Sequence, residues 1–429
     1  MNRVGITGFG VVSPIGVARE AFWQSLADGR GGIGPITRFD CSAFSVRLAG
    51  EVKQRAELPA GDRVDAIDGI DAIAATAATA GVAADDPKVG FALAACAEAL
   101  GQAGIASLTR DTLLHLGVSL EAFDMQKAIC GGRPDFRSIA ERSMRPGAPP
   151  LQIPLDTASR LIARRFGVPG RSLTNCSACA AGAQAIGHAF RCVRAGRCAA
   201  AVCGGLDSMI NPLGVGGFQM LGALTTDNAR GESACRPFDA SRSGTVLGEG
   251  AAVVVLEPLD AARAAGKRVL AEVCGYGSTL DAWSLSAPDP EGDGAARAML
   301  VALDDAGIRA EQIAHINAHG TATRVNDEVE AAAIRRVFAR TWQRIPVSST
   351  KSMTGHLIAA AGAVEVGACL LALVMKQVPP NPFLNSVGQG CELAHVGHAA
   401  VPFDGEYVMS NSFGFGGQNV SLVLRRCDG

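Results

Sequence analysis

A repeated helix motif constrains the fold of this chain more than any other feature of its 429 residues. The sequence Ala-Ala-Gly-Ala occupies positions 180–183, with Gly187 after three further residues, and it recurs 180 positions later at 360–363, with Gly367 at the same spacing. Each copy follows a strand-like run and a short polar turn. Small residues one turn apart on an apolar helix let another backbone approach closely, so the two helices can pack on each other. The repeat therefore predicts two duplicated halves, each with one buried central helix.

Short β-branched or apolar runs alternate with helical segments along the rest of the chain. This alternation is typical of an α/β fold whose sheet is covered on both faces. No linker rich in proline or serine separates the halves, so we expect residues 1–257 and 258–429 to form one globule. The predicted strands are Val4–Thr7, Ser172–Asn175, Ala200–Cys203, Ala252–Leu256, Ile313–Asn317 and Val420–Leu424, and the predicted helices are Ala72–Ala84, Lys88–Ala103, Ala180–Ala195 and Ala359–Lys376.

Charge and hydropathy patterns exclude several classes of protein. The net charge is −2, so nothing indicates nucleic acid or an anionic membrane as the main partner. The chain enters a strand-like run at Val4 without a signal peptide, and its 13 cysteines are irregularly spaced, so we expect a cytoplasmic protein with free, mostly buried thiols. The apolar stretch Leu357–Met375 is long enough to raise the question of a membrane span. It carries Glu365 in its middle, and a buried core helix fits better.

The first motif with chemical potential is Ser177-Ala178-Cys179-Ala180-Ala181-Gly182, between a predicted strand and the first repeat helix. Unpaired N–H groups and the positive end of a helix dipole stabilise a thiolate at such a point, so we expect a lowered pKa for Cys179. The same N–H groups can hold an oxyanion. The local sequence is equally compatible with a structural, buried cysteine, which is the role expected of four neighbours: Cys176, Cys192, Cys198 and Cys203.

Cys176 and Cys179 also form a Cys-x-x-Cys pair, the spacing of a redox centre or of half a zinc site. No second pair of this kind exists in the sequence. Strand alternation points Cys176 away from the turn that carries Cys179. A thiol oxidoreductase remains as an alternative, and it predicts that Cys176→Ser is as damaging as Cys179→Ser.

His319 lies in the loop Asn317-Ala318-His319-Gly320-Thr321-Ala322-Thr323, directly after a predicted strand. Loops at strand ends are where side chains converge on a ligand, although a structural histidine is the alternative. His315 and His319 have the spacing of helical zinc ligands, but a strand and loop context removes that common face. We therefore expect His315 to be structural.

A second histidine, His356, ends the loop 348–356 that leads into the second repeat helix. The loop also carries Lys351, which is the expected partner for Glu365 because a buried carboxylate needs one. An ordinary loop with a solvated lysine is the alternative.

Glycines mark both ends of the chain. The segment Asn411–Asn419 alternates glycines with two phenylalanines, which gives a backbone that can approach a ligand and supply an N–H to an oxyanion hole. Near the N-terminus, Gly8 and Gly10 lack the third glycine of a dinucleotide-binding loop and give only a weak signal.

In this order and over essentially the whole chain, the motifs resemble those of the elongating β-ketoacyl-acyl-carrier-protein synthases (types I and II) of the thiolase superfamily. The resemblance implies a five-layered αβαβα fold built from two duplicated halves, with acyl carrier protein as the substrate-bearing partner and a homodimer or a ketosynthase heterodimer as the assembly. The segments that carry it are Val4–Gly10 with Ser13-Pro14, the cysteine turn, Arg236–Asp239 with Gly248–Gly250, and the NAHGT, KSMTGH and GFGG motifs.

The resemblance also implies a role for each matching residue. Cys179 matches the acyl-accepting nucleophile, and His319 and His356 match the two histidines of decarboxylation. Phe415 matches the gating phenylalanine, whose N–H shares the oxyanion hole with that of Cys179. The residues of the supporting network are Lys351, Glu365, Asp327 and Glu330, and the expected substrate contacts are Thr321, Thr323 and Phe413.

The implied reaction is a decarboxylative Claisen condensation in two stages. An acyl group first moves from the phosphopantetheine thioester of a carrier protein to Cys179. Malonyl-carrier protein then loses carbon dioxide while His319 and His356 stabilise the enolate, which attacks the acyl-cysteine. Neutral imidazoles suffice as hydrogen-bond donors, so neither a metal nor a redox cofactor is expected.

Several positions depart from the family pattern, and one of them is the unusual Asn175-Cys176 before the cysteine turn. Ser243 stands where an aspartate is usual, Thr245 where an aromatic is usual, and Arg324 where a proline is common. These departures put the usual housekeeping substrate in doubt, so the implied pathway is either fatty acid synthesis or specialised polyene or polyketide assembly. Arginines that can meet an acidic carrier protein, or equally form a solvated helix face, are Arg160, Arg164 and Arg165.

Two relatives of the same fold are less compatible with the sequence. A degradative thiolase would use a second cysteine near the C-terminal glycines, and residues 413–419 contain none. A non-catalytic chain-length partner would lack the nucleophile, whereas this chain has Cys179 and both histidines.

Overall fold

The computed structural model describes residues 1–53, 87–120 and 152–427, with short strands at 122–123, 129–130 and 133–134 and the single residue 141 between them. The predicted helix Ala72–Ala84 lies outside the described residues. The described helices are α1 (Arg19–Asp28), α3 (Lys88–Ala103), α6 (Thr157–Phe166), α7 (Ala181–Arg194), α8 (Pro212–Met220), α9 (Leu259–Ala264), α10 (Asp293–Ala306), α11 (Arg324–Val337), α12 (Lys351–Thr354) and α13 (Ala361–Met375).

Most strands of the described chain join one mixed sheet, in the order β10-β5-β11-β12-β1-β13-β19-β18-β14-β15, with β2 paired to β1. Its strands are β1 (Val4–Ser13), β2 (Gly16–Val17), β5 (Thr112–Gly117), β10 (Arg171–Asn175), β11 (Ala200–Ser208), β12 (Glu249–Pro258), β13 (Ala271–Leu280), β14 (Ile313–Asn317), β15 (Val347–Ser348), β18 (Tyr407–Gly414) and β19 (Gln418–Arg426). Short two-stranded pairs are formed by β3 (Ile33–Pro35) with β4 (Leu48–Gly50), β6 (Ala122–Phe123) with β9 (Gln152–Ile153), β7 (Ile129–Cys130) with β8 (Arg133–Pro134) and β16 (Gln377–Val378) with β17 (Val401–Pro402).

The large sheet consists of two halves with the same strand order, read from opposite edges. From the outer edge inward, the first half has the order β10, β5, β11, β12, β1, and the second half has the order β15, β14, β18, β19, β13. If the five strands of each half are numbered in chain order, with β2 left out, both halves read third, second, fourth, fifth, first. The directions match as well, because the outer three strands of each half are parallel and the inner pairings are antiparallel. A short antiparallel contact between β1 and β13 joins the halves. The duplication predicted from the helix repeat is therefore confirmed by the topology.

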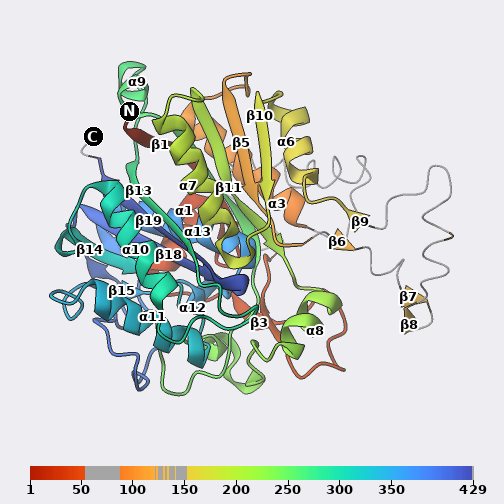
Figure 1. The fold of residues 1–429 in the computed structure, drawn as a ribbon. Coiled ribbons are helices and arrows are strands. Elements are labelled where there is room, and N and C mark those ends of the chain that lie inside the picture. The colour runs from red at the N-terminus through yellow and green to blue at the C-terminus, as the bar shows by residue number, and fades with distance from the viewer. Residues whose placement is uncertain are drawn as a thin grey trace.

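The helices form three layers around the two halves of the sheet (Figure 1). Helices α7 and α13 contact each other and strands of both halves, so they form the central layer. Helix α3, with α6 against it, covers the outer face of the first half, and α10, with α11 against it, covers that of the second. The layer sequence α-β-α-β-α is the arrangement that the family resemblance implied.

Paired glycines let the outer helices lie directly on the sheet. A Cβ added to Gly8 of β1 would overlap the carbonyl oxygen of Ala99 in α3. A Cβ added to Gly275 of β13 would overlap the carbonyl oxygen of Ala302 in α10 in the same way. The sequence Gly-x-Gly at 8–10 therefore serves helix packing, and its counterpart at 275–277 is a second trace of the duplication that sequence analysis did not detect.

Each central helix also accepts an aromatic ring, at the glycine that closes its repeat. The ring of Tyr276 in β13 fills the space beside Gly187 of α7, and the ring of Phe9 in β1 fills the space beside Gly367 of α13. The first half thus receives a ring from the second half, and the second half receives one from the first. This exchange ties the halves together through their central layer.

The predicted elements are largely present, with longer strands than expected. The bounds of α3 and β14 agree with the prediction, whereas β1 and β11 run several residues further. Among the described residues, one helical segment, Ile358–Met375, is long and apolar enough to cross a membrane, and 89% of it is buried inside the fold. The packing is that of a core helix.

We predict that Gly187→Ala destabilises the protein by about 1–3 kcal/mol, because the added methyl group overlaps the ring of Tyr276 in a close-packed core. Gly101→Ala is the matched control, because Gly101 lies in α3 with open space beside it and should gain about 0.5–1 kcal/mol. Equilibrium unfolding in denaturant measures both. Equal stability of the two variants would contradict the packing described here.

Candidate active site

Cys179 lies on a tight turn at the start of the first central helix. The turn is a short 3₁₀ segment, η2 (Ala178–Ala180), and Ala178 adopts a φ of 47°. A left-handed backbone at a residue other than glycine costs of order 1–3 kcal/mol and is concentrated at functional sites. The same turn recurs 180 residues later in η5 (Ile358–Ala360), where Ile358 has a φ of 48°. Both halves therefore begin their central helix with the same strained turn.

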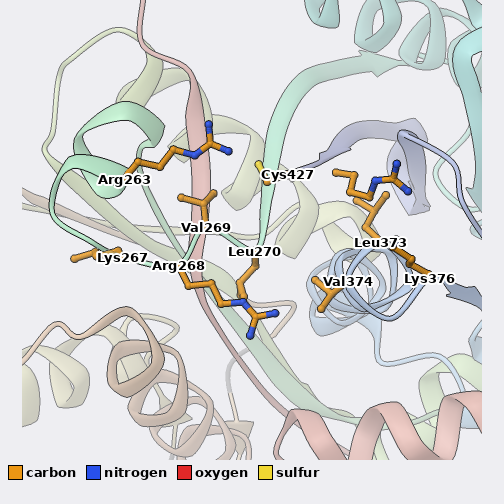
Figure 2. A pocket seen from close by; sticks show the side chains of 10 residues that line it. Arg263, Lys267, Arg268, Val269, Leu270, Leu373, Val374, Lys376 and Cys427 are labelled. Carbon is orange, nitrogen blue, oxygen red and sulfur yellow. The ribbon is translucent and has the colours of Figure 1, made fainter. Parts of the chain in front are cut away.

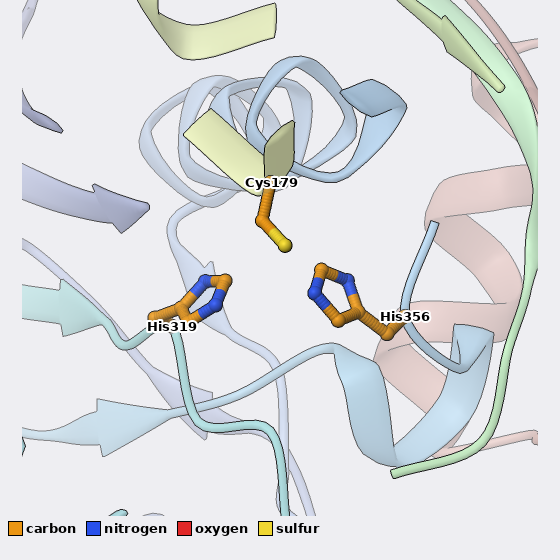
Figure 3. Close-up of side chains that lie close together, drawn as sticks. All are labelled: Cys179, His319 and His356. Carbon is orange, nitrogen blue, oxygen red and sulfur yellow. The ribbon is translucent and has the colours of Figure 1, made fainter. Parts of the chain in front are cut away.

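Three side chains from the two halves converge in front of this turn (Figure 3). The sulfur of Cys179 points between the imidazole rings of His319 and His356. The Sγ atom of Cys179 and one ring nitrogen of each histidine all lie within 4.8 Å of one another. The ring centroids of the two histidines are 5.3 Å apart, with the rings nearly perpendicular at 82°. All three residues are buried. The structure thus brings together the three side chains that the sequence singled out.

Lys351 holds the imidazole of His319. Its ammonium lies 3.2 Å from Nδ1 of His319 and donates to the carbonyl oxygen of the same residue at 2.6 Å. The charge is balanced by Glu365, which pairs with Lys351 inside the core, as expected from the sequence. Because an ammonium can only donate hydrogen bonds, Nδ1 of His319 is an acceptor, and the neutral ring carries its proton on Nε2.

A backbone N–H fixes the second imidazole. The N–H of Ile358 donates to Nδ1 of His356 at 3.2 Å, so this neutral ring also carries its proton on Nε2. Burial lowers the pKa of both His319 and His356 well below the usual value of 6.5, and the charge of Lys351 lowers both further. The site therefore presents two neutral N–H donors to any group between them.

A cysteine and two histidines are also a ligand set that zinc accepts. Ligating imidazoles normally donate their second N–H to a carbonyl or carboxylate. Here the second nitrogen of His319 faces the Lys351 ammonium and that of His356 faces a backbone N–H. The lone pairs are thereby directed away from the site, and the arrangement suits hydrogen-bond donation better than metal ligation.

Two buried carboxylates shape the loop that carries His319. Glu330 of α11 accepts the N–H groups of His319 and Gly320, both at 2.8 Å. Asp327 of the same helix accepts the N–H of Thr321 at 3.0 Å. Burial raises the pKa of Glu330 to about 7 and also raises that of Asp327. Both acids bind the backbone of the loop. Among the described residues, neither acid is hydrogen-bonded to the imidazole of His319.

The thiol of Cys179 does not have the lowered pKa expected from its helix start. Burial raises its pKa to about 11, and the charge of Lys351 and the N–H of Phe415 only partly oppose this effect. The prediction of a thiolate at neutral pH was wrong because the side chain is 4% exposed, and desolvation outweighs the helix terminus. At neutral pH, Cys179 is therefore a neutral thiol.

The glycine-rich C-terminal segment closes the site from the other side. Phe415 starts η6 (Phe415–Gly417), and its N–H and that of Cys179 both face the Cys179 sulfur. Gly416 and Gly417 have φ values of 78° and 75°, which favour glycine. The ring of Phe415 lies 6.0 Å from that of Phe218 in α8. Two backbone N–H groups thus converge on the Cys179 sulfur.

The remaining predicted contacts lie around the histidines. The ring of Phe413 in β18 is 6.0 Å from that of His319. The hydroxyls of Thr321 and Thr323 are 2.8 Å apart. Among the unusual positions, Ser243 is hydrogen-bonded to Thr225 at 2.7 Å and Arg324 is exposed at the start of α11.

Cys176, which forms the Cys-x-x-Cys pair with Cys179, and His315, which has zinc-ligand spacing to His319, both lie apart from the site. Cys176, expected to be buried, is exposed beyond the end of the edge strand β10, and its thiol donates to the carbonyl of Ser119 at 2.6 Å. His315 is buried and bonded to Ser348 at 3.1 Å, which agrees with a structural role. Both cysteines of the Cys-x-x-Cys pair are free thiols.

A cavity of about 390 Å³ lies at the C-terminal end of α13, away from the turn that carries Cys179 (Figure 2). Its apolar lining includes Leu270 and Leu373.

A buried acid, Asp207, was not predicted from the sequence. Its carboxylate accepts the N–H of Ala359 at 3.0 Å and so links the two halves. An aspartate two residues after a pair of glycines, in Gly204-Gly205-Leu206-Asp207, is the signal that the sequence offers for it.

Comparison with known proteins agrees with this geometry. Family models for the N-terminal and C-terminal domains of beta-ketoacyl synthases match residues 1–262 and 270–385. The 3-oxoacyl-[acyl-carrier-protein] synthase 2 of Synechocystis sp. is 37% identical over 434 residues, which cover 99% of this chain and 98% of the relative.

Two solved structures extend the comparison. The ishigamide ketosynthase/chain length factor has a TM-score of 0.83 and 32% identity, with both chains fully covered. A ketosynthase bound to a hexaketide, in complex with its type II PKS acyl-carrier protein, has a TM-score of 0.83 and 25% identity, covering 99% of this chain and 100% of the other.

We predict that alkylation of Cys179 by iodoacetamide accelerates about tenfold per pH unit between pH 7 and 9, because only the thiolate reacts and the thiol pKa is about 11. Mass mapping of the Cys179 peptide measures the rate. A short unstructured peptide with one cysteine, whose thiol pKa is about 8.5, is the control, and its rate should begin to level off near pH 9. A plateau for Cys179 below pH 8 would contradict the raised pKa.

Proposed function

Because this chain belongs to the β-ketoacyl synthase family and is a β-ketoacyl-acyl-carrier-protein synthase, we propose that Cys179, His319 and His356 carry out its carbon–carbon bond formation. The observation that supports these roles most strongly is the convergence of one sulfur and two neutral imidazoles within 4.8 Å. Each imidazole is fixed as an Nε2–H donor by a separate partner.

The first half-reaction transfers an acyl group to Cys179. The sulfur attacks the thioester carbonyl of acyl-carrier protein, and the N–H groups of Cys179 and Phe415 hold the developing oxyanion. The new sulfur–carbon bond forms as the bond to the phosphopantetheine sulfur breaks. The proton of the neutral Cys179 thiol ends on that departing sulfur, so the charges balance.

The second half-reaction uses the two imidazoles. The thioester carbonyl of malonyl-carrier protein accepts hydrogen bonds from His319 and His356, which stabilises negative charge on its oxygen. The bond to the carboxylate breaks, carbon dioxide leaves, and its electron pair forms the enolate. The enolate carbon then attacks the acyl carbonyl on Cys179, the bond between that carbonyl carbon and the cysteine sulfur breaks, and the released thiolate takes up one proton from solvent. No metal or redox cofactor takes part in any of these steps.

The surrounding residues keep this geometry. We assign Lys351 and Glu365 to the orientation of His319, and Asp327 and Glu330 to the shape of its loop. We assign Phe415 to the gate over the acyl pocket. The assigned substrate contacts are Thr321, Thr323 and Phe413.

The unusual positions favour a specialised substrate over housekeeping fatty acids. Thr245 replaces an aromatic with a smaller side chain, and Ser243 replaces an acid, so neither position has the family's usual shape and charge. The similarity to the ishigamide ketosynthase and to a hexaketide-bound ketosynthase supports polyene or polyketide assembly. Acyl carrier protein is the proposed donor of both substrates.

We also propose pairing with a second chain of the same fold, an identical copy in the first instance, through the edge strand β10. Within the described part of the chain β10 pairs only with β5. Its residues Arg171, Ser172 and Leu173 are exposed. An exposed edge strand presents unpaired N–H and C=O groups, which are a template for pairing with another chain.

We predict that Cys179→Ala blocks acylation, whereas His319→Ala and His356→Ala still acquire the acyl group. Loss of one N–H donor should slow release of carbon dioxide from malonyl-carrier protein by about 10²–10³-fold. Intact-mass analysis with acyl-carrier proteins measures the first step, and release of labelled carbon dioxide measures the second.

Cys176→Ser is the matched control for the cysteine, because its thiol lies outside the site, and it should keep both steps. Release of carbon dioxide at the wild-type rate by His319→Ala would contradict the role of His319. Equal damage from Cys176→Ser and Cys179→Ser would favour thiol redox chemistry instead.

We predict that Leu173→Asp converts a dimer into monomers, because a two-fold pairing of β10 brings two like charges together. Light scattering coupled to gel filtration measures the mass. Leu300→Asp, at a leucine on α10 that is also exposed, is the control and should leave the dimer intact. A monomeric wild-type protein, or a dimer that survives Leu173→Asp, would contradict pairing of two copies through β10.

A further inference from the structure

Asp207 is a buried acid to which the proposed reaction gives no role. It lies near the end of β11 and has an exposed fraction of 0%. One carboxylate oxygen accepts the N–H of Ser208 at 2.9 Å, and the other accepts the N–H of Ala359 at 3.0 Å. Burying a carboxylate is costly unless hydrogen bonds compensate, so these N–H groups are part of the reason the acid is tolerated here.

Ala359 occupies in the second half the position that Cys179 occupies in the first. The two residues are 180 positions apart, and each follows a residue with a left-handed backbone. In the first turn, the N–H of Cys179 faces the nucleophilic sulfur. In the second turn, the equivalent N–H of Ala359 is given to Asp207. The second turn therefore has neither a nucleophile nor an open oxyanion site.

The peptide groups of Ala359 are fixed by the first half of the chain. A Cβ added to Gly182 of α7 would lie 2.7 Å from the carbonyl oxygen of Ala359, and one added to Gly205 of β11 would overlap the same oxygen. These two glycines enclose the carbonyl, while Asp207 holds the N–H. Within this enclosed turn, the preceding N–H, that of Ile358, donates to Nδ1 of His356.

We propose that Asp207 is a positioning residue for decarboxylation, which holds the turn so that the N–H of Ile358 meets Nδ1 of His356 and keeps the proton of that ring on Nε2. This inference rests on the proposed function, because it assumes that His356 acts as an N–H donor to malonyl thioester. Asp207 acts through the turn and not on the substrate.

The charge of Asp207 has a second and opposite effect. It raises the pKa of the Cys179 thiol, so its removal should make this thiol more reactive at neutral pH. A residue that only stabilised the fold would weaken both half-reactions together. Asp207 should instead favour decarboxylation and restrain the thiol, which gives its loss a distinct signature.

The test compares Asp207→Ala, Asp207→Asn and Asp207→Glu in the full-length protein. Asp207→Ala should slow release of carbon dioxide from malonyl-carrier protein by roughly 10- to 100-fold, because a small misplacement of a catalytic group costs up to about 10²-fold. Alkylation of Cys179 at pH 7.5 should become faster in the same variant. Asp207→Glu keeps the charge and both acceptor oxygens and should restore most of the decarboxylation rate.

Histidine tautomers give a readout that is independent of activity. In ¹⁵N-histidine-labelled protein, Nδ1 of His356 should be unprotonated in the wild type and partly protonated in Asp207→Ala. Asp207→Asn has one acceptor oxygen and no charge, so the protonated fraction of Nδ1 should lie between those of the wild type and Asp207→Ala. If the alanine variant does not fold, Asp207→Asn provides the test. An unchanged His356 tautomer in folded Asp207→Ala or folded Asp207→Asn would overturn the proposal.

Glu249→Gln is the matched control, because it neutralises another buried acid, one that accepts a hydrogen bond from Ser208 at 2.7 Å and not from the turn. It should lower both half-reactions by the same factor. Equal losses in Asp207→Ala would reduce Asp207 to a structural role. Normal decarboxylation by His356→Ala would instead overturn the proposed function, so the two failures are distinguishable.

Discussion

The close packing of the two central helices is the constraint on which the rest of the structure depends. Gly182 of α7 leaves room for the backbone of Ala359, and Gly362 of α13 leaves room for Ala183, where an added Cβ would lie 2.7 Å away in each case. Any larger side chain would separate the helices, because protein interiors have no spare volume at such contacts. The separation would move Cys179 of the first half away from His319 and His356 of the second half.

Duplication has produced two copies of one turn with different uses. Around Cys179, the first copy directs the N–H of Cys179 at the sulfur of the same residue. The second copy, around Ala359, uses its N–H groups to bind Asp207 and to orient His356. A turn that is suited to holding negative charge has thus become a support for the second imidazole. The first turn therefore supplies the sulfur of the site, and the equivalent turn of the second half orients one of its imidazoles.

The sequence predicts the fold class and singles out Cys179, His319 and His356 because each is carried by a local pattern. The apolar pattern of α3 is one example, and the small residues around Cys179 are another. Strand β18 was missed because Ser410, Asn411 and Ser412 look like loop residues but are buried. The raised pKa of Cys179 and the role of Asp207 depend on burial and on contacts between halves, which no local pattern contains.

The exchange of aromatic rings between the halves has a consequence for synthesis on the ribosome. The first strand carries Phe9, but the helix that receives this ring contains Gly367 and is made near the end of translation. Likewise, Gly187 of α7 cannot contact the ring of Tyr276 until the second half has been synthesised. Contacts of such long sequence separation slow folding, because the intervening loop must be closed first. The nascent first half therefore leaves the ribosome with an apolar groove that only its own C-terminal half can fill.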